Sequence, residues 1–75
     1  MNEMGVSLIE YQGQLRPLAM VHGRTVLNDS VLEIRSWEHA DDIARKFEVD
    51  SRLIVWGPGT LDWCKTEWGE PPTSQ

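Results

Sequence analysis

The clearest hydrophobic pattern in the chain has the period of an α-helix and covers about residues 37–49. Ser36 precedes this segment and is a good N-cap, because its hydroxyl can accept a hydrogen bond from an unpaired amide of the first turn. Acidic residues stand in the first half of the segment and basic residues in the second, the order that the helix dipole favours. The apolar positions repeat at helical spacing; they are Trp37, Ala40, Ile43, Ala44 and Phe47. We therefore predict one amphipathic helix with a single apolar face.

Shorter alternating segments before the helix predict β-strands. Residues 31–35 alternate between apolar and polar side chains and lead into the helix, and residues 6–11 form an N-terminal strand. A further strand is expected at 24–27. Pro17 has no amide donor, so the surrounding stretch, 15–21, is expected to be an edge strand or irregular.

A second group of apolar residues follows the helix and predicts a C-terminal β-hairpin over about residues 52–66. Its first half is rich in β-branched and aromatic side chains, as buried strands are. The Gly-Pro-Gly sequence at 57–59 is a turn signal, after which the chain is expected to return as the second strand. In that register Ile54 faces Trp63, which places Trp63 in the core, and Trp37 on the helix stripe is expected there too.

Together these elements indicate an α+β domain, with an antiparallel sheet of four to six short strands and one helix packed on one face. The whole chain, 1–75, is expected to form a single domain with loose ends at 1–5 and 69–75. One helix covers only one face of a sheet, so the other face is left for a partner or for a second copy of the chain. We expect a monomer or a homodimer, with self-association opposed by the net charge of −5.

The charge balance is acidic, with seven Lys and Arg residues against twelve Asp and Glu residues. Only Arg45 and Lys46 are adjacent cations, whereas nucleic-acid binding depends on clustered cations, so we do not expect direct nucleic-acid binding. No apolar run approaches the roughly 18 residues of a membrane span, and the N-terminus has no secretory pattern. Cys64 is the only cysteine, which fits a reducing compartment. These features predict a cytoplasmic protein.

Candidate catalytic and metal-binding residues are few. His22, His39 and Cys64 are scattered and lack the spacing of a four-ligand zinc site. A lone cysteine beside Trp63 is more often a buried, inert thiol than a nucleophile. Pro58 removes an amide that a phosphate-binding loop would use. We therefore expect no metal, no cofactor and no enzymatic activity.

Two groups of residues are candidates for contact with a partner. The acidic group lies on and just after the predicted helix, where it would steer a basic partner; a solvated helix face is the alternative interpretation. Two tryptophans near the C-terminus are not fixed by helix or strand phase, and tryptophan is common among interface hot spots. The candidates are Glu38, Asp41, Asp42, Glu48 and Asp50 in the acidic group, with Trp56 and Trp68 as anchors.

In size, acidity and strand-helix-strand layout the chain resembles the accessory proteins of bacteriophages and mobile elements, of which anti-CRISPR proteins are one class. The resemblance extends to no residue motif, and it implies a small module that occludes a basic nucleic-acid-binding surface of a host complex. The leading hypothesis is therefore a non-catalytic inhibitor that binds another protein. The alternative is a structural subunit of a homo-oligomer or larger complex, and a small-ligand binder or enzyme ranks third.

Overall fold

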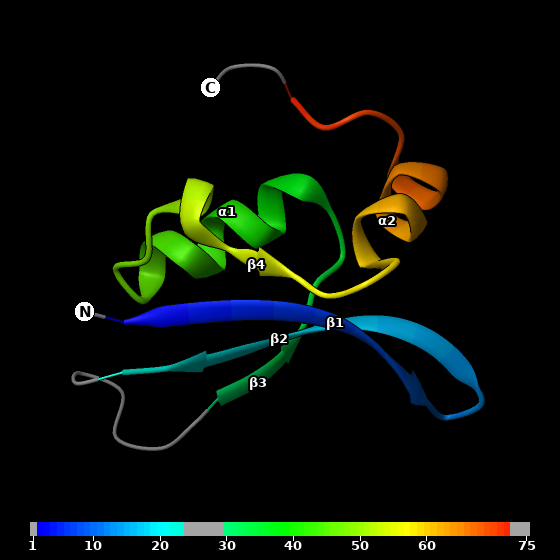
Figure 1. Ribbon diagram of the computed structural model, residues 1–75, viewed down its shortest axis with the longest axis horizontal. Helices are drawn as coiled ribbons and strands as arrows, with labels where there is room; N and C mark the ends of the chain where they lie inside the picture. The colour runs from blue at the N-terminus through cyan, green and yellow to red at the C-terminus, as the bar shows by residue number, and fades with distance from the viewer. Residues whose placement is uncertain (1, 24–29, 73–75) are drawn as a thin grey trace.

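The sheet lies on one side of the molecule and both α-helices lie on the other (Figure 1). The computed structural model describes residues 2–23 and 30–72. Over these ranges the fold is a small α+β arrangement of four strands and two α-helices. The elements in chain order are β1 (Glu3–Tyr11), β2 (Gln14–His22), β3 (Ser30–Glu33), α1 (Trp37–Lys46), a 3₁₀ turn η1 (Ser51–Leu53), β4 (Val55–Trp56) and α2 (Thr60–Trp68).

The strands lie in the order β3-β2-β1-β4, and the sheet is mixed rather than antiparallel as predicted. β1, β2 and β3 pair antiparallel, but β4 runs parallel to β1, with Gly5 opposite Val55 and Val6 opposite Trp56. Parallel strands cannot be joined by a tight hairpin and need a crossover. Here β3 and β4 stand at opposite edges, and α1 crosses the sheet between them (Figure 1). The crossover fixes which face the helix covers.

β1 begins earlier than the predicted strand 6–11, so the expectation of a loose end at 1–5 is wrong for the described residues. β1 and β2 form one continuous hairpin from Glu3 opposite His22 to the turn at residues 12 and 13. Asn2 is buried, and its side-chain Nδ2 donates a hydrogen bond to the backbone oxygen of Phe47 at 2.7 Å. This contact ties the start of β1 to the end of α1, 45 residues later in the sequence.

β2 is a regular inner strand, although Pro17 led us to expect an edge or irregular strand over 15–21. The carbonyl oxygen of Pro17 accepts a hydrogen bond from the amide of Ile34 at 3.0 Å. The backbone of Pro17 therefore faces the β3 side, just past Glu33, where β3 ends. The missing amide leaves no gap in the ladder with β1. The strand predicted at 24–27 lies outside the described residues, and 31–35 is confirmed in part as β3.

The predicted helix forms, and its apolar stripe covers the sheet. Ser36 caps it as expected, because its hydroxyl accepts a hydrogen bond from the amide of His39 at 3.0 Å. The helix ends at Lys46, three residues before the predicted end at 49, and Phe47 is its half-buried C-cap. The core of the molecule joins this stripe to the inner side chains of the strands; its buried members are Met4, Val6, Ala19, Val21, Ile34, Ala40, Ile43, Ala44, Val49 and Ile54.

The predicted hairpin over 52–66 is wrong, because its second half is helix α2. The chain leaves the sheet at Gly57, whose amide donates a hydrogen bond to the oxygen of Val6 at 2.8 Å. A Cβ on Gly57 would lie only 2.9 Å from Oγ of Ser7 and 3.3 Å from the oxygen of Val6, so glycine allows the loop to approach β1 this closely. Gly59, with a φ of 76°, then starts α2 in a left-handed conformation that suits glycine. Trp63 is consequently on a helix and does not face Ile54 across a hairpin.

Two isoleucines allow the core to be tested with one kind of substitution. Ile34 is 1% exposed and lies within the core, whereas Ile9 is 41% exposed near the end of the β1–β2 hairpin. We expect Ile34→Ala to lower the free energy of unfolding by about 2–5 kcal/mol. This is comparable to the whole stability of a chain of this size, about 3–5 kcal/mol, so the variant should be largely unfolded. Ile9→Ala should cost less than about 1 kcal/mol. Urea denaturation followed by circular dichroism measures both, and equal losses would contradict the assignment of the core.

Candidate functional site

The four tryptophans, which are far apart in sequence, form one cluster on the helical side of the sheet. Trp37 lies at its centre, with its ring centroid 5.8 Å from that of Trp56 and 5.1 Å from that of Trp68. Trp63 continues the cluster, at 6.4 Å from Trp68. All three pairs are edge-to-face, an arrangement that contributes about 0.5–1.5 kcal/mol per pair beyond burial. All four side chains are only partly buried, so the cluster is at once packing and surface.

A hydrogen bond fixes the cluster to the end of α2. The indole Nε1 of Trp37 donates to the backbone oxygen of Gly69 at 3.0 Å. It joins the first residue of α1 to the residue that ends α2, which has a φ of 82°. The first residues of the segment predicted as a loose end, 69–75, therefore hold a defined position, and 73–75 lie outside the described residues.

Asp41 and Trp56, two of the predicted contact residues, border the same hollow. It has a volume of about 230 Å³ and lies between α1, the η1–β4 segment and the chain after α2. Trp37 and Ile54 supply apolar walls, and Arg52 stands at its border. The complete lining is Trp37, Ala40, Asp41, Ser51, Arg52, Ile54, Trp56, Leu61, Pro71 and Pro72. The hollow thus combines indole rings with a carboxylate, groups that suit a cationic side chain.

The predicted acidic group is divided by the structure. Glu38 and Asp42 are exposed on the outer face of α1 and Asp41 is half-buried beside them, so these three lie together. Glu48 and Asp50 follow the helix, and Glu48 is exposed with a φ of 61°. Within α1, Asp42 lies 3.8 Å from the guanidinium of Arg45, a weak surface pair. The three carboxylates of α1 are the coherent part of the predicted acidic surface.

Asp50 is engaged within the chain. Its carboxylate accepts a hydrogen bond from the Arg52 amide at 2.9 Å and from the Arg52 guanidinium at 2.8 Å, and it caps η1. The Arg52 side chain, aided by that amide, lowers the pKa of Asp50 to about 2. Asp50 therefore stays ionised, but its charge is matched by Arg52 before any partner arrives. It contributes less than the α1 carboxylates to an acidic surface.

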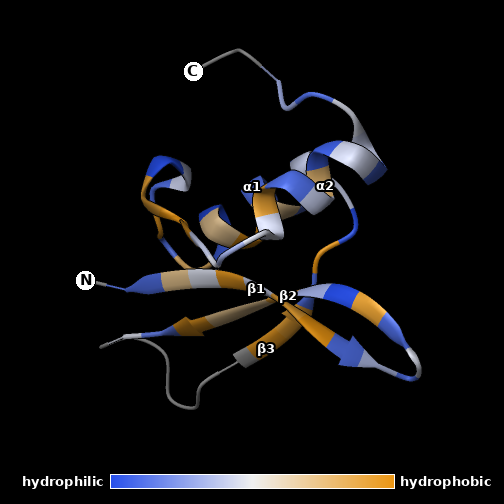
Figure 2. Cartoon of the chain, turned by 45° about the vertical axis from the view of Figure 1, so that its right-hand side comes forward, coloured by the Kyte–Doolittle hydropathy of each residue, from blue (hydrophilic) through white to orange (hydrophobic). Residues whose placement is uncertain are grey.

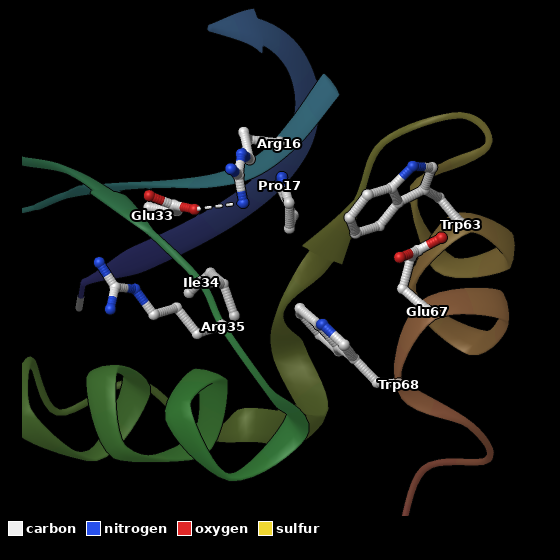
Figure 3. Close-up of a pocket in the computed structure, with 8 residues that line it drawn as sticks. All are labelled: Arg16, Pro17, Glu33, Ile34, Arg35, Trp63, Glu67 and Trp68. Carbon is white, nitrogen blue, oxygen red and sulfur yellow. Dashed lines mark ion pairs between the residues drawn. The ribbon is translucent and has the colours of Figure 1, made fainter. Parts of the chain in front are cut away.

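A second hollow of about 460 Å³ lies between the ends of β2 and β3 and helix α2 (Figure 3). Trp63 and Trp68 stand on the α2 side, and Glu67 lies between them. On the sheet side, Arg16 pairs with Glu33 at 3.3 Å and Arg35 lies nearby. Pro17 and Ile34 complete the lining. Sequence reasoning missed this hollow, because Glu67 and the two indoles meet only when 60–68 is a helix.

Cys64 and Thr60 are the two buried residues of α2, and both are 0% exposed. Burial raises the pKa of the Cys64 thiol from the ordinary 9.0 to about 11. A thiol with such a pKa is almost fully protonated at neutral pH and is a poor nucleophile. The structure thus gives the same physical account of Cys64 that the sequence suggested, although the residue lies on a helix and not on a strand.

The raised pKa of Cys64 predicts that the stability of the protein depends on pH above neutrality. The unfolded chain loses its thiol proton before the folded chain does, so the free energy of unfolding should fall as pH rises from about 9 to about 11. Cys64→Ala should remove this part of the pH dependence. Urea denaturation of both proteins across that range gives the comparison. Curves for the two proteins that stay parallel would show that the thiol pKa is the same in both states.

Within residues 2–23 and 30–72, no group of three or more His, Cys, Asp or Glu side chains is placed to hold a metal ion. None of the helices in these ranges is long and apolar enough to cross a membrane. No protein-family model, no curated protein and no solved structure matches this chain. What the chain does must therefore be inferred from its own surfaces.

Proposed function

We propose that this chain is a non-catalytic protein-binding module that occludes a basic surface of its partner, the mode of action of small inhibitors from phages and mobile elements. The observation that carries the proposal is the hollow in which Asp41 borders Trp37 and Trp56. A lysine or arginine of the partner would enter it, with its charge against the carboxylate and its stem against the indoles. Exposed Glu38 and Asp42 stand on the adjoining helix face.

The charge distribution along α1 supports this direction of approach. Between residues 37 and 42 the helix carries three carboxylates and no Lys or Arg, and its two cations, Arg45 and Lys46, come in the last turn. A basic partner is therefore attracted to the first half of α1, the half next to the hollow. Steering of this kind raises the rate of association more than it slows dissociation.

Anchoring is a separate contribution, and the tryptophans supply it. Trp56 is partly buried and its ring is held edge-to-face by Trp37, so it is already ordered before a partner binds. A preordered aromatic side chain loses little conformational freedom on binding. A basic surface covered in this way is closed to nucleic acid without any chemical reaction. Trp68, the other predicted anchor, also packs edge-to-face on the ring of Trp37.

The steering contribution can be tested by removing two charges. The double variant Asp41→Asn, Asp42→Asn should associate with the partner about 10-fold more slowly than the wild type, since steering changes association rates by about 10–10³. The matched control is Glu10→Gln with Asp62→Asn, which removes the same charge from exposed positions elsewhere. The partner is first captured from a host lysate, and rate constants are then measured by surface plasmon resonance at low and high salt.

Two results would refute this mechanism. Salt screens exposed charges beyond a distance of about 8 Å at physiological ionic strength. The first refuting result is therefore a rate of association that stays constant as the salt concentration rises. The other is an equal loss for the two double variants, because net charge alone would then account for the effect.

The anchoring contribution is tested with two indoles from opposite ends of the cluster. Trp56→Ala should raise the dissociation rate constant about 10-fold or more, as expected for an interface hot spot, with little change in association. Trp63→Ala removes a comparable, partly buried indole that borders the other hollow. It should leave dissociation within about 3-fold of wild type. If only Trp63→Ala speeds dissociation, the partner occupies the hollow of Figure 3 instead.

A further inference from the structure

The face of the sheet opposite the helices is uncovered and carries a continuous apolar row. In the registers of the four strands, Val55, Gly5, Met20 and Val31 are successive neighbours from one edge of the sheet to the other. Val55 is 70% exposed, Met20 47% and Val31 57%. Both helices lie on the other side (Figures 1 and 2), so no described element of the chain shields this row.

More apolar side chains extend the row along β1 and β2. Leu18 is partly buried beside it, and Ile9 and Tyr11 are 41% and 50% exposed on the same face. Beyond the edge strand, Leu53 is 61% exposed and borders, together with Val55, an apolar hollow of about 270 Å³. Monomeric proteins rarely expose contiguous apolar patches of more than a few hundred Å². A surface of this composition is typical of an interface.

Gly5 is a second, independent observation. It lies within a strand that is paired on both sides, and the register of β1 continues without a bulge on either side of it. A Cβ at this position would meet only the oxygen of Val55, at 3.6 Å, which is an ordinary contact. The fold of one chain therefore does not require glycine here, although glycine weakens a strand. Such a glycine often marks a place where another backbone or ligand comes close.

The described strands place few charged side chains on this face. At one end the carboxylate of Glu3 lies 3.0 Å from the imidazole of His22, and at the other Arg16 lies 3.3 Å from Glu33. Many of the chain's acidic residues stand elsewhere, among them those of α1 and α2. Two copies can therefore bring these faces together without opposing two strongly negative surfaces.

We propose that the open sheet face is the interface of a symmetric homodimer, in which two copies pack face to face across Gly5 and Met20. A standard interface buries about 800 Å² per partner, roughly one seventh of the 5410 Å² that one chain exposes. The exposed apolar row lies at the centre of the contact, and the Glu3–His22 and Arg16–Glu33 pairs lie at its rim. Such a dimer carries its two Asp41 hollows on its outer sides, so it is bivalent toward a basic partner.

Sedimentation velocity across a concentration series tests the dimer. The wild type should be dimeric at about 100 μM, and Met20→Glu, which brings two carboxylates together at the interface, should be monomeric there. Leu15→Glu is the matched control, because Leu15 is 52% exposed but lies on the other face of the hairpin, opposite Glu10. It should dimerise like the wild type. Circular dichroism checks that both variants are folded.

Gly5→Thr gives a sharper test, since it separates the interface from the fold. Threonine suits a strand better than glycine, so the melting temperature of a monomeric background carrying Met20→Glu should not fall. In the otherwise wild-type chain, the same change should raise the dimer dissociation constant at least about 10-fold, because the side chain separates the two faces.

A wild type that stays monomeric up to about 0.5 mM, or that forms assemblies larger than a dimer, overturns the proposal. So does a Met20→Glu variant that dimerises like the wild type. The proposal does not depend on the function of the Asp41 hollow. The double variant Asp41→Asn, Asp42→Asn should dimerise like the wild type. The monomeric Met20→Glu variant should still bind the basic partner through its one Asp41 hollow, with an unchanged association rate per site. The two ideas therefore fail in different experiments.

Discussion

The fold depends on the pairing of strand β1, which joins the antiparallel part of the sheet, through β2, to the parallel strand β4. The inner side chains of β1, Met4 and Val6, are fully buried beneath α1, and the oxygen of Val6 also receives the amide of Gly57. One residue earlier in the chain than the strand itself, Asn2 holds the backbone at the end of α1. The end of the first helix, the parallel strand β4 and the loop that starts α2 are thus all fixed against the first few residues. A chain this short buries only about 60% of the surface that its unfolded form exposes. A strand that pairs with two neighbours and packs under a helix therefore contributes a large share of the contacts that stabilise the fold.

The same arrangement explains why the molecule has two unlike sides. The β3–α1–β4 crossover brings α1 over one face, and α2 follows β4 onto that same face, so no described helix reaches the other one. The helical side carries the carboxylates of α1 and the partly buried indoles. The sheet side carries Met20, Val31 and Val55, with the Glu3–His22 and Arg16–Glu33 pairs toward its two ends. The proposed partner site and the proposed dimer interface therefore lie on opposite sides of the molecule, so a partner and a second copy of the chain would not compete for one surface.

Sequence patterns predicted the features that depend on local interactions. The helix over 37–49 was predicted correctly apart from its last turn, because the Ser36 cap, the charge order and the apolar stripe all act within that segment. The hairpin over 52–66 was predicted wrongly, because Leu61, Trp63 and Cys64 fit a strand or a helix equally well over so few residues. Contacts distant in sequence decide the outcome: Thr60 and Cys64 are buried, and Trp68 packs on Trp37. The candidate site, too, was predictable only where it depends on local sequence. Grouping Glu38, Asp41 and Asp42 needs only a helix, whereas placing Asp41 beside Trp56 needs the parallel pairing of β4 with β1, which no local pattern indicates.

The tryptophan cluster links stability to the candidate site. Isolated helices shorter than about 12–15 residues are marginal in water, and α2 has nine residues. It is held by buried Thr60 and Cys64 and, one turn further on, by Trp68, which packs on Trp37. The hydrogen bond from Trp37 to Gly69 fixes the end of the helix. Trp37 therefore holds α2 in place and also forms a wall of the hollow that contains Asp41. A partner side chain packed on Trp37 and Trp56 would contact the same ring that positions α2. A shift of that ring would be passed to Trp68, which lines the second hollow. Substitutions at Trp37 would mix loss of folding with loss of binding. Trp56, which touches the cluster through a single ring pair, is the position where binding can be separated from the packing of α2.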